Sequence, residues 1–101
     1  MSKKLGTKCV HSGGISDDKY FGNTTPIYPS ITYDYLKSDV YPRYFNTPNQ
    51  LSVCKKIAEL ENAEDAVLFG SGLAAVASSM FSLLKTGDHV ILQKSLYGGT
   101  I

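Results

Sequence analysis

The fold is decided by the stretch Ala66-Val67-Leu68-Phe69-Gly70-Ser71-Gly72-Leu73-Ala74-Ala75. Residues 66–69 form a short, continuously apolar run, which is typical of a buried strand. The turn at 70–72 ends this run, and apolar residues then recur at the spacing of one helix face, at Leu73, Val76, Ala77, Met80 and Leu84. Residues 89–93 predict a second strand, so the order strand, helix, strand indicates an α/β layer.

A second helix is predicted before this layer. Thr47 can cap it, Pro48 suits the first helical position and Gln50 completes a capping box. One mostly apolar face follows at helical spacing, formed by Leu51, Cys54, Ile57, Ala58 and Glu61. We expect this helix to end near Glu61-Asn62 and the later helix to end between Lys85 and Gly87. Residues 47–101 are therefore predicted to be the start of an α/β domain.

Residues 1–46 have a different composition. They hold three of the four prolines and six of the seven tyrosines, and they show no helical period. Only Ile31-Thr32-Tyr33-Asp34-Tyr35 alternates in the manner of a short strand. So long a stretch without regular structure is uncommon inside a compact domain. We interpret residues 1–46 as an irregular N-terminal arm that packs on something else, such as a neighbouring subunit.

Composition excludes several classes of protein. Apolar residues make up 43% and charged residues 19% of 101 residues, and the net charge is +1. These values are typical of a globular protein, and the scattered Lys and Arg residues predict no nucleic-acid or membrane surface.

Cys9 and Cys54 fit neither a metal site nor a disulfide framework, which indicates reduced thiols and a cytoplasmic protein. The predicted elements make a poor core, so we expect an incomplete chain.

Three segments are candidates for binding. The glycine turn at 70–72 opens a helix, where free backbone N–H groups and the helix dipole attract anions, and Ser71 can add a hydroxyl donor. Tyr41-Pro42-Arg43 offers a guanidinium beside a phenol, which suits a phosphate or carboxylate. Tyr97-Gly98-Gly99-Thr100 follows a predicted strand, where α/β folds bind ligands, and its ring can stack on a flat cofactor. Taken singly, each also fits a simpler role: a capped turn, an exposed arginine and a surface turn.

Together these motifs resemble the Cys/Met-metabolism (trans-sulfuration) family of pyridoxal-phosphate (PLP) enzymes. The resemblance rests on Tyr41-x-Arg43, Asn46, Ser71-Gly72-Leu73-Ala74-Ala75, Gly87-Asp88 and Tyr97-Gly98-Gly99-Thr100, and on two arm segments, 10–13 and 26–32. It implies a fold-type I transferase in which this chain is the N-terminal part of the large α/β domain. It also implies a homodimer or homotetramer acting on a small amino-acid substrate.

The resemblance assigns roles to individual residues. The backbone of Gly72 and Leu73, with Ser71, would hold the PLP phosphate. Tyr41 and Arg43 would reach the phosphate site of the neighbouring subunit. Tyr97 would stack on the pyridine ring and is the candidate for catalytic proton transfer. No metal is expected.

The implied reaction acts on C–S bonds of sulfur amino acids, of the cystathionine γ-lyase or γ-synthase type. Alternatives are an O-acetylhomoserine sulfhydrylase, a cystathionine β-lyase, an aminotransferase of the same fold and a non-enzymatic binding module of 101 residues. Methionine γ-lyases usually carry cysteine where Gly99 stands, which disfavours that activity.

Three departures from the family pattern stand out. Asn46-Thr47-Pro48 replaces the usual Asn-Pro-Thr, and Pro42 replaces a small polar residue. The lysine to which the family attaches the cofactor, and the aspartate that pairs with the pyridine nitrogen, are absent from the 101 residues. We therefore expect this chain alone to be inactive.

Overall fold

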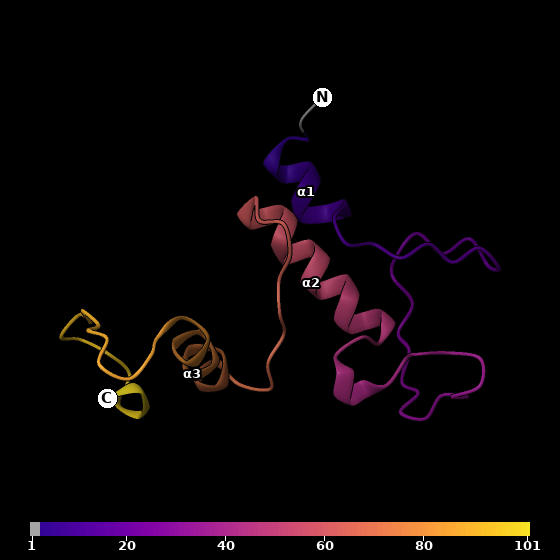
Figure 1. Ribbon diagram of the computed structural model, residues 1–101. Helices are drawn as coiled ribbons and strands as arrows, with labels where there is room; N and C mark the ends of the chain where they lie inside the picture. The colour runs from indigo at the N-terminus through magenta and orange to yellow at the C-terminus, as the bar shows by residue number, and fades with distance from the viewer. Residues whose placement is uncertain (1–2) are drawn as a thin grey trace. The chain divides into compact units, whose positions relative to one another are not determined.

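The computed structural model describes residues 3–101, and its regular secondary structure is helical (Figure 1). The elements in chain order are the helix α1 (Leu5–His11), the 3-10 turn η1 (Pro42–Tyr44), the helices α2 (Pro48–Glu61) and α3 (Gly72–Leu83), and the 3-10 turn η2 (Gly98–Thr100). The chain divides into two compact units. The first runs up to Leu68, and the second runs from Phe69 to Ile101.

Both predicted ends of α2 are confirmed. Thr47 is extended, Pro48 is the first helical residue, and the Gln50 side-chain carbonyl accepts hydrogen bonds from the Thr47 N–H at 3.1 Å and the Thr47 hydroxyl at 2.7 Å. At the other end Asn62 takes the left-handed conformation, with φ of 53°. Asparagine tolerates this conformation better than most residues, so the helix ends there.

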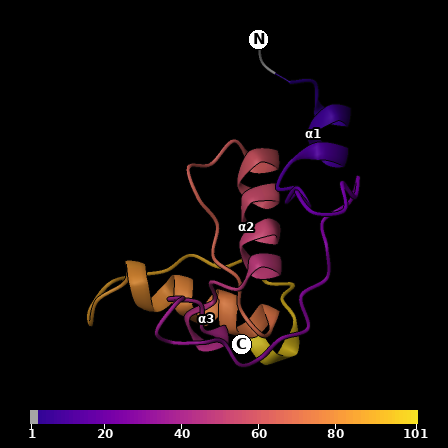
Figure 2. The same ribbon diagram turned by 90° about the vertical axis from the view of Figure 1, so that its right-hand side faces the viewer.

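The arm contains a helix that the sequence pattern did not predict. Residues 5–11 lack an apolar period, and a helix of 7 residues is not stable by itself in water. α1 forms because it lies against α2 (Figures 1 and 2). The Lys8 ammonium donates to the Glu59 carbonyl at 2.9 Å and to the Asn62 side-chain oxygen at 2.7 Å, and the Lys56 ammonium donates to the Cys9 carbonyl at 3.1 Å.

The arm beyond α1 also follows α2 of its own chain. The hydroxyl of Ser52 donates to the Gly13 carbonyl at 2.6 Å. One turn earlier on α2, the Asn49 side chain donates to the Pro26 carbonyl at 2.8 Å and accepts from the Tyr28 N–H at 2.7 Å. The first unit is therefore the arm held by side chains along α2.

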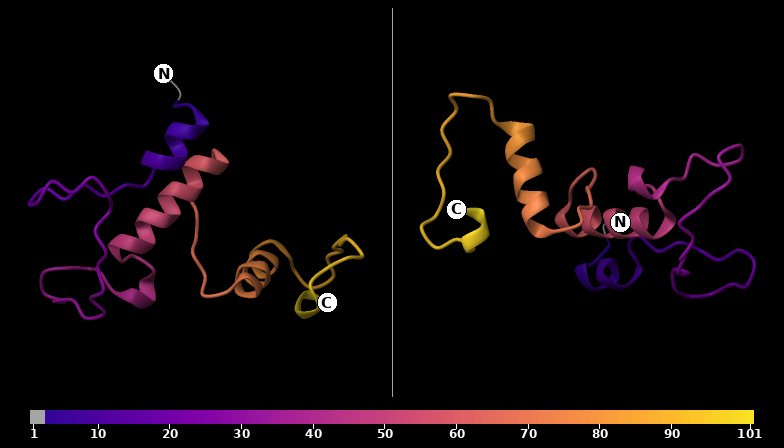
Figure 3. Two further views of the ribbon diagram at one scale, coloured as in Figure 1. Left: turned by 180° about the vertical axis from the view of Figure 1, so that it is seen from behind. Right: turned by 90° about the horizontal axis from the view of Figure 1, so that it is seen from below.

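The second unit is built on α3, whose predicted start is confirmed. Ser71 is its N-cap, and the helix ends at Leu83, slightly before the Lys85–Gly87 end that the sequence indicated. A tight turn follows, in which Gly87 has φ of +98° and the Lys85 and Asp88 backbones and the Asp88 carboxylate hydrogen-bond to one another. η2 then lies against α3 (Figure 3).

The three predicted strands do not form in residues 3–101. Residues 31–35, 66–69 and 89–93 are irregular chain, and the Ile91 side chain is 99% exposed. A strand is stable only when a neighbouring strand satisfies its N–H and C=O groups, and these three segments do not pair with one another. The α/β layer that the sequence predicted is therefore not seen directly in residues 3–101.

Very little of the described chain is buried. Ala58 on α2 is the one apolar side chain that counts as buried, and Ser12 is the one polar side chain. Large apolar side chains such as Phe81, on α3, remain exposed. The helices α2 and α3 therefore expose apolar side chains that no other part of residues 3–101 buries. None of these helices is long and apolar enough to cross a membrane.

Candidate functional site

The turn before α3 presents two free backbone donors. The Ser71 hydroxyl oxygen accepts from the Ala74 N–H at 3.1 Å, and the Ser71 carbonyl accepts from the Ala75 N–H at 3.1 Å. Among the described residues, nothing accepts a hydrogen bond from the N–H of Gly72 or Leu73. These two groups sit at the positive end of the helix dipole and are available to an anion.

The space beside this turn is open. No atom of the described chain lies within 4 Å of the position that a Cβ on Gly72 would take. Ser71 caps the helix through its hydroxyl oxygen, which is the simple capping role that the sequence also allowed. Its hydroxyl proton can still donate a hydrogen bond. Capping and anion binding are therefore compatible at Ser71.

Tyr97 lies in the same unit as this turn. It precedes η2, its carbonyl accepts from the Thr100 N–H at 2.8 Å, and its side chain is 79% exposed. The ring lies over Gly99, because a Cβ there would stand 2.9 Å from the Tyr97 Cε1 atom. Since η2 contacts α3, the candidate phosphate turn and the candidate stacking ring belong to one compact unit.

Tyr41 and Arg43 lie in the first unit, at η1. Tyr41 is the N-cap of η1, and its ring contacts that of Tyr44 edge to face with 5.1 Å between centroids. The Arg43 guanidinium is exposed and has no hydrogen-bond or ion-pair partner within residues 3–101. Tyr41 and Arg43 therefore lie together in the first unit. The second unit holds Ser71, Gly72 and Leu73 as well as Tyr97.

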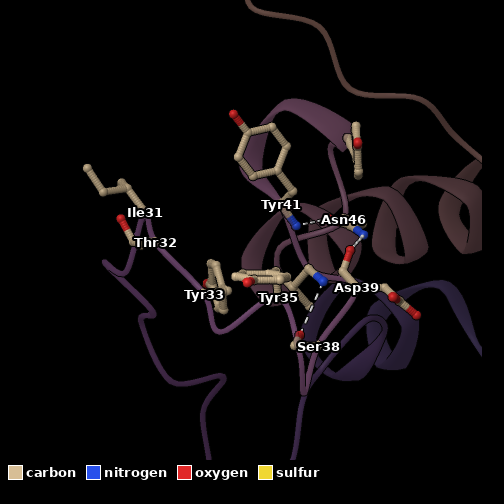
Figure 4. Close-up of a pocket in the computed structure, with 10 residues that line it drawn as sticks. Ile31, Thr32, Tyr33, Tyr35, Ser38, Asp39, Tyr41 and Asn46 are labelled. Atoms are coloured by element: carbon tan, nitrogen blue, oxygen red, sulfur yellow. Dashed lines mark hydrogen bonds between the residues drawn. The ribbon is translucent and has the colours of Figure 1, made fainter.

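A hollow beside Tyr41 was not predicted from the sequence. It has a volume of about 750 Å³ and is lined by arm residues that include Tyr33, Tyr41, Tyr44 and Asn46 (Figure 4). The Tyr33 hydroxyl is buried and has no hydrogen-bond partner in the described chain. The clustering of tyrosines in residues 28–44 was a signal for such a feature, but their spacing gave no position for it.

The thiols and acidic residues form no further site in the described part of the chain. Cys9 is exposed and Cys54 is half-buried, and both are free. Among residues 3–101, no cluster of three or more His, Cys, Asp or Glu side chains is arranged to hold a metal ion.

Comparison with known proteins then decides the family. The model of the Cys/Met metabolism PLP-dependent enzyme family matches residues 6–101. The chain belongs to this family. The family has the fold-type I architecture and uses pyridoxal phosphate, and the match lies in its N-terminal region. The resemblance read from the motifs is thereby confirmed.

Individual relatives agree with the family. The chain is 34% identical to an L-methionine gamma-lyase of Fusobacterium nucleatum subsp. polymorphum, over 95% of this chain and 27% of the relative. It is 35% identical to a cystathionine gamma-lyase of Bacillus subtilis, over 99% and 27%. It is 40% identical to a cystathionine beta-lyase of Lactococcus lactis subsp. cremoris, over 93% and 26%. The chain thus spans about a quarter of the length of these relatives. No solved structure matches it.

Proposed function

We propose that the whole protein is a PLP-dependent enzyme that breaks or forms the C–S bond of a sulfur amino acid, of the cystathionine γ-lyase or γ-synthase type. The family match over residues 6–101 carries this proposal. We further propose that the present chain supplies much of the cofactor's phosphate site and one face of its ring site.

The start of α3 fits the phosphate of PLP. The free N–H groups of Gly72 and Leu73 and the hydroxyl of Ser71 are three donors on consecutive residues, and the absence of a Cβ at Gly72 allows a phosphate to approach the backbone. Hydrogen bonds to a charged group are stronger than neutral ones. This turn therefore anchors the cofactor in our proposal.

Tyr97 is the proposed catalytic residue. Its exposed ring can cover one face of the pyridine, and its phenol can hold or move a proton at the amino group of the substrate. When bound, PLP draws electrons away from the α-carbon of the amino acid. Gly99 leaves room for the ring of Tyr97, so the two residues act together in placing the phenol.

Tyr41 and Arg43 are proposed to serve the site of a neighbouring subunit. The Arg43 guanidinium is exposed, and its planar fork matches phosphate oxygens. In this proposal residues 1–46 form an arm that contacts the neighbour, residues 47–101 begin a parallel α/β domain, and the enzyme is a cytoplasmic homodimer or homotetramer. The apolar surface left exposed on α2 and α3 supports such packing.

Substitution of Gly72 tests the phosphate turn in the whole protein. Gly72→Pro removes one free N–H at the first helical position, where proline is favoured. Ser71 already has ψ of 157°, the extended conformation that a residue before proline requires. We expect PLP affinity to fall by about 1.5–3 kcal/mol, the worth of a hydrogen bond to a charged group. Gly72→Ala keeps the N–H and is the matched control, expected to weaken binding less.

The measurement is the PLP dissociation constant, followed by cofactor absorbance, together with the thermal midpoint of the apoenzyme. Equal PLP affinity for Gly72→Pro and the parent protein would show that the turn does not bind the phosphate.

A second experiment identifies the products of cystathionine cleavage by the whole protein. These products distinguish the proposed γ-lyase from the cystathionine β-lyase that the Lactococcus relative suggests. A γ-lyase releases cysteine, whereas a β-lyase releases homocysteine.

A further inference from the structure

Asn46 joins two points of the chain that flank the Tyr41–Arg43 segment. Its side-chain oxygen accepts from the Tyr41 N–H at 2.8 Å, and its side-chain nitrogen donates to the Asp39 carbonyl at 2.8 Å (Figure 4). One amide thus uses its acceptor on residue 41 and its donor on residue 39. A side-chain amide carries a donor and an acceptor on one planar end, whereas Ala has neither and an ionised Asp has acceptors alone, so neither can replace the pair of bonds.

The chain between Tyr41 and Asn46 is folded back on itself. The Tyr44 N–H donates to the Tyr41 carbonyl at 2.9 Å, and the Phe45 N–H donates to the Pro42 carbonyl at 3.1 Å. Phe45 has φ of 54°, a left-handed conformation that is unfavourable for a bulky residue unless its surroundings hold it. The loop is therefore closed by Asn46 on one side and by η1 on the other.

This closure fixes the backbone of Arg43 and leaves its side chain free. Pro42 restricts the chain further, because its ring locks φ. In the part of the chain described here the Arg43 guanidinium contacts no acceptor, so its direction depends on the backbone that carries it. Asn46 has no such freedom, since both ends of its amide are engaged.

We propose that Asn46 is a positioning residue for the phosphate-binding pair Tyr41 and Arg43, acting through its two hydrogen bonds to the backbone at 39 and 41. The inference rests on the proposed function, in which Tyr41 and Arg43 contact the cofactor phosphate. Asn46 itself does not touch the cofactor. A positioned arginine loses less freedom on binding, so the positioning contributes to cofactor affinity.

Asn49 provides a matched control on the same unit. Its side-chain amide also bridges two backbone groups, accepting from the Tyr28 N–H and donating to the Pro26 carbonyl. The two asparagines therefore make the same kind of bonds, but those of Asn49 join residues 26 and 28, whereas those of Asn46 join residues 39 and 41. A purely structural role predicts similar consequences for Asn46→Ala and Asn49→Ala.

The experiment measures the PLP dissociation constant of the whole protein. Asn46→Ala and Asn49→Ala are each compared in the native background and in a background that carries Tyr41→Phe and Arg43→Ala. Asn46→Ala is expected to weaken PLP binding about 10-fold in the native background, because an arginine whose backbone is no longer held loses more freedom on binding. In the second background it is expected to change binding less than about 2-fold, because sites that act as one unit are not additive.

Each outcome decides the matter. Loss confined to the native background, together with no such pattern for Asn49→Ala, supports the positioning role. Equal loss in both backgrounds, or no loss from Asn46→Ala, overturns it while the proposed function stands. If Tyr41→Phe with Arg43→Ala leaves PLP affinity unchanged, the phosphate role of the pair and the positioning role fall together. Should Asn46→Ala not fold, Asn46→Asp carries the same comparison, because it keeps the acceptor for Tyr41 and loses the donor for Asp39.

Discussion

Gly13 touches the backbone of α2 at Ser52. The Ser52 hydroxyl donates to the Gly13 carbonyl at 2.6 Å. A Cβ on Gly13 would collide with the Ser52 carbonyl oxygen and would stand 2.9 Å from the backbone nitrogen of Lys56. Gly13 also has φ of +69°, in the left-handed region. Both observations show that only glycine fits where the arm crosses the helix.

The first prediction follows from this contact. Gly13→Ala should destabilise the first unit in the whole protein by about 2–4 kcal/mol, which combines overpacking with left-handed strain. The measurements are the thermal midpoint and the rate at which protease cleaves the arm. Gly14→Ala is the control, because its Cβ would meet nothing closer than the His11 carbonyl at 3.5 Å. Equal stability of the two variants would contradict the close approach.

A second prediction concerns Ser12, which is 2% exposed. Its hydroxyl donates to the Glu59 carboxylate at 2.8 Å, a bond that links the arm to α2. Ser12→Ala should cost about 1–3 kcal/mol, because a hydrogen bond from a buried hydroxyl to a half-buried carboxylate is lost. Ser16→Ala removes an exposed hydroxyl that donates to the Asp18 carboxylate at 3.1 Å, and it should cost far less. Urea unfolding of the whole protein measures the free energy of unfolding of both variants. Similar losses for Ser12→Ala and Ser16→Ala would show that the burial of Ser12 does not strengthen its hydrogen bond.

In residues 3–101 the predicted helices α2 and α3 are present and the predicted strands are not, for one physical reason. The ends of α2 depend on Thr47, Gln50 and Asn62, which act through contacts within a few residues. Strands depend on partners far along the chain, so residues 66–69 could be recognised as apolar but not as paired. α1 escaped prediction because α2 stabilises it through Lys8 and Ser12, and no local pattern records that contact.

The candidate site divides in the same way. Ser71 and Gly72 were predictable, because a turn that opens a helix has a local signature and its free N–H groups follow from helix geometry. For Tyr41 and Arg43 the residues themselves indicated only an anion-binding pair, and the proposed role at the neighbouring subunit's phosphate came from the family resemblance. The amide bridge made by Asn46 was not predictable, since it joins residues 39 and 41 through a loop whose shape the sequence does not reveal.

A third prediction follows from the buried area of residues 3–101. Because Ala58 is the one apolar side chain that is buried there, apolar burial is small against a conformational entropy cost of about 1–2 kcal/mol per residue. The 101-residue chain alone should unfold gradually on heating, bind a hydrophobic dye and show no turnover of cystathionine with added PLP. Far-ultraviolet circular dichroism follows the transition. A single sharp transition of the monomeric chain, or turnover above that of free PLP, would contradict this expectation.

The fourth prediction tests whether Arg43 serves the neighbouring subunit. In the whole protein, Arg43→Ala should weaken PLP retention by about 1.5–3 kcal/mol, and Arg43→Lys should restore it only in part because lysine lacks the planar fork. Lys37→Ala is the control. It removes an arm charge whose only ion pair within the described chain is with Asp34, at 3.2 Å and largely exposed, and such pairs contribute little.

Mixed oligomers then separate action within a subunit from action across the boundary. Arg43→Ala protomers are refolded together with protomers that lack the cofactor-binding lysine of the family. If the arginine acts across the boundary, each mixed dimer contains one site with the lysine of one chain and the arginine of the other, and activity should recover above that of either variant alone. If both variants are inactive by themselves and mixed oligomers form without recovering activity, Arg43 serves its own subunit, because then every site in the mixture lacks one of the two groups.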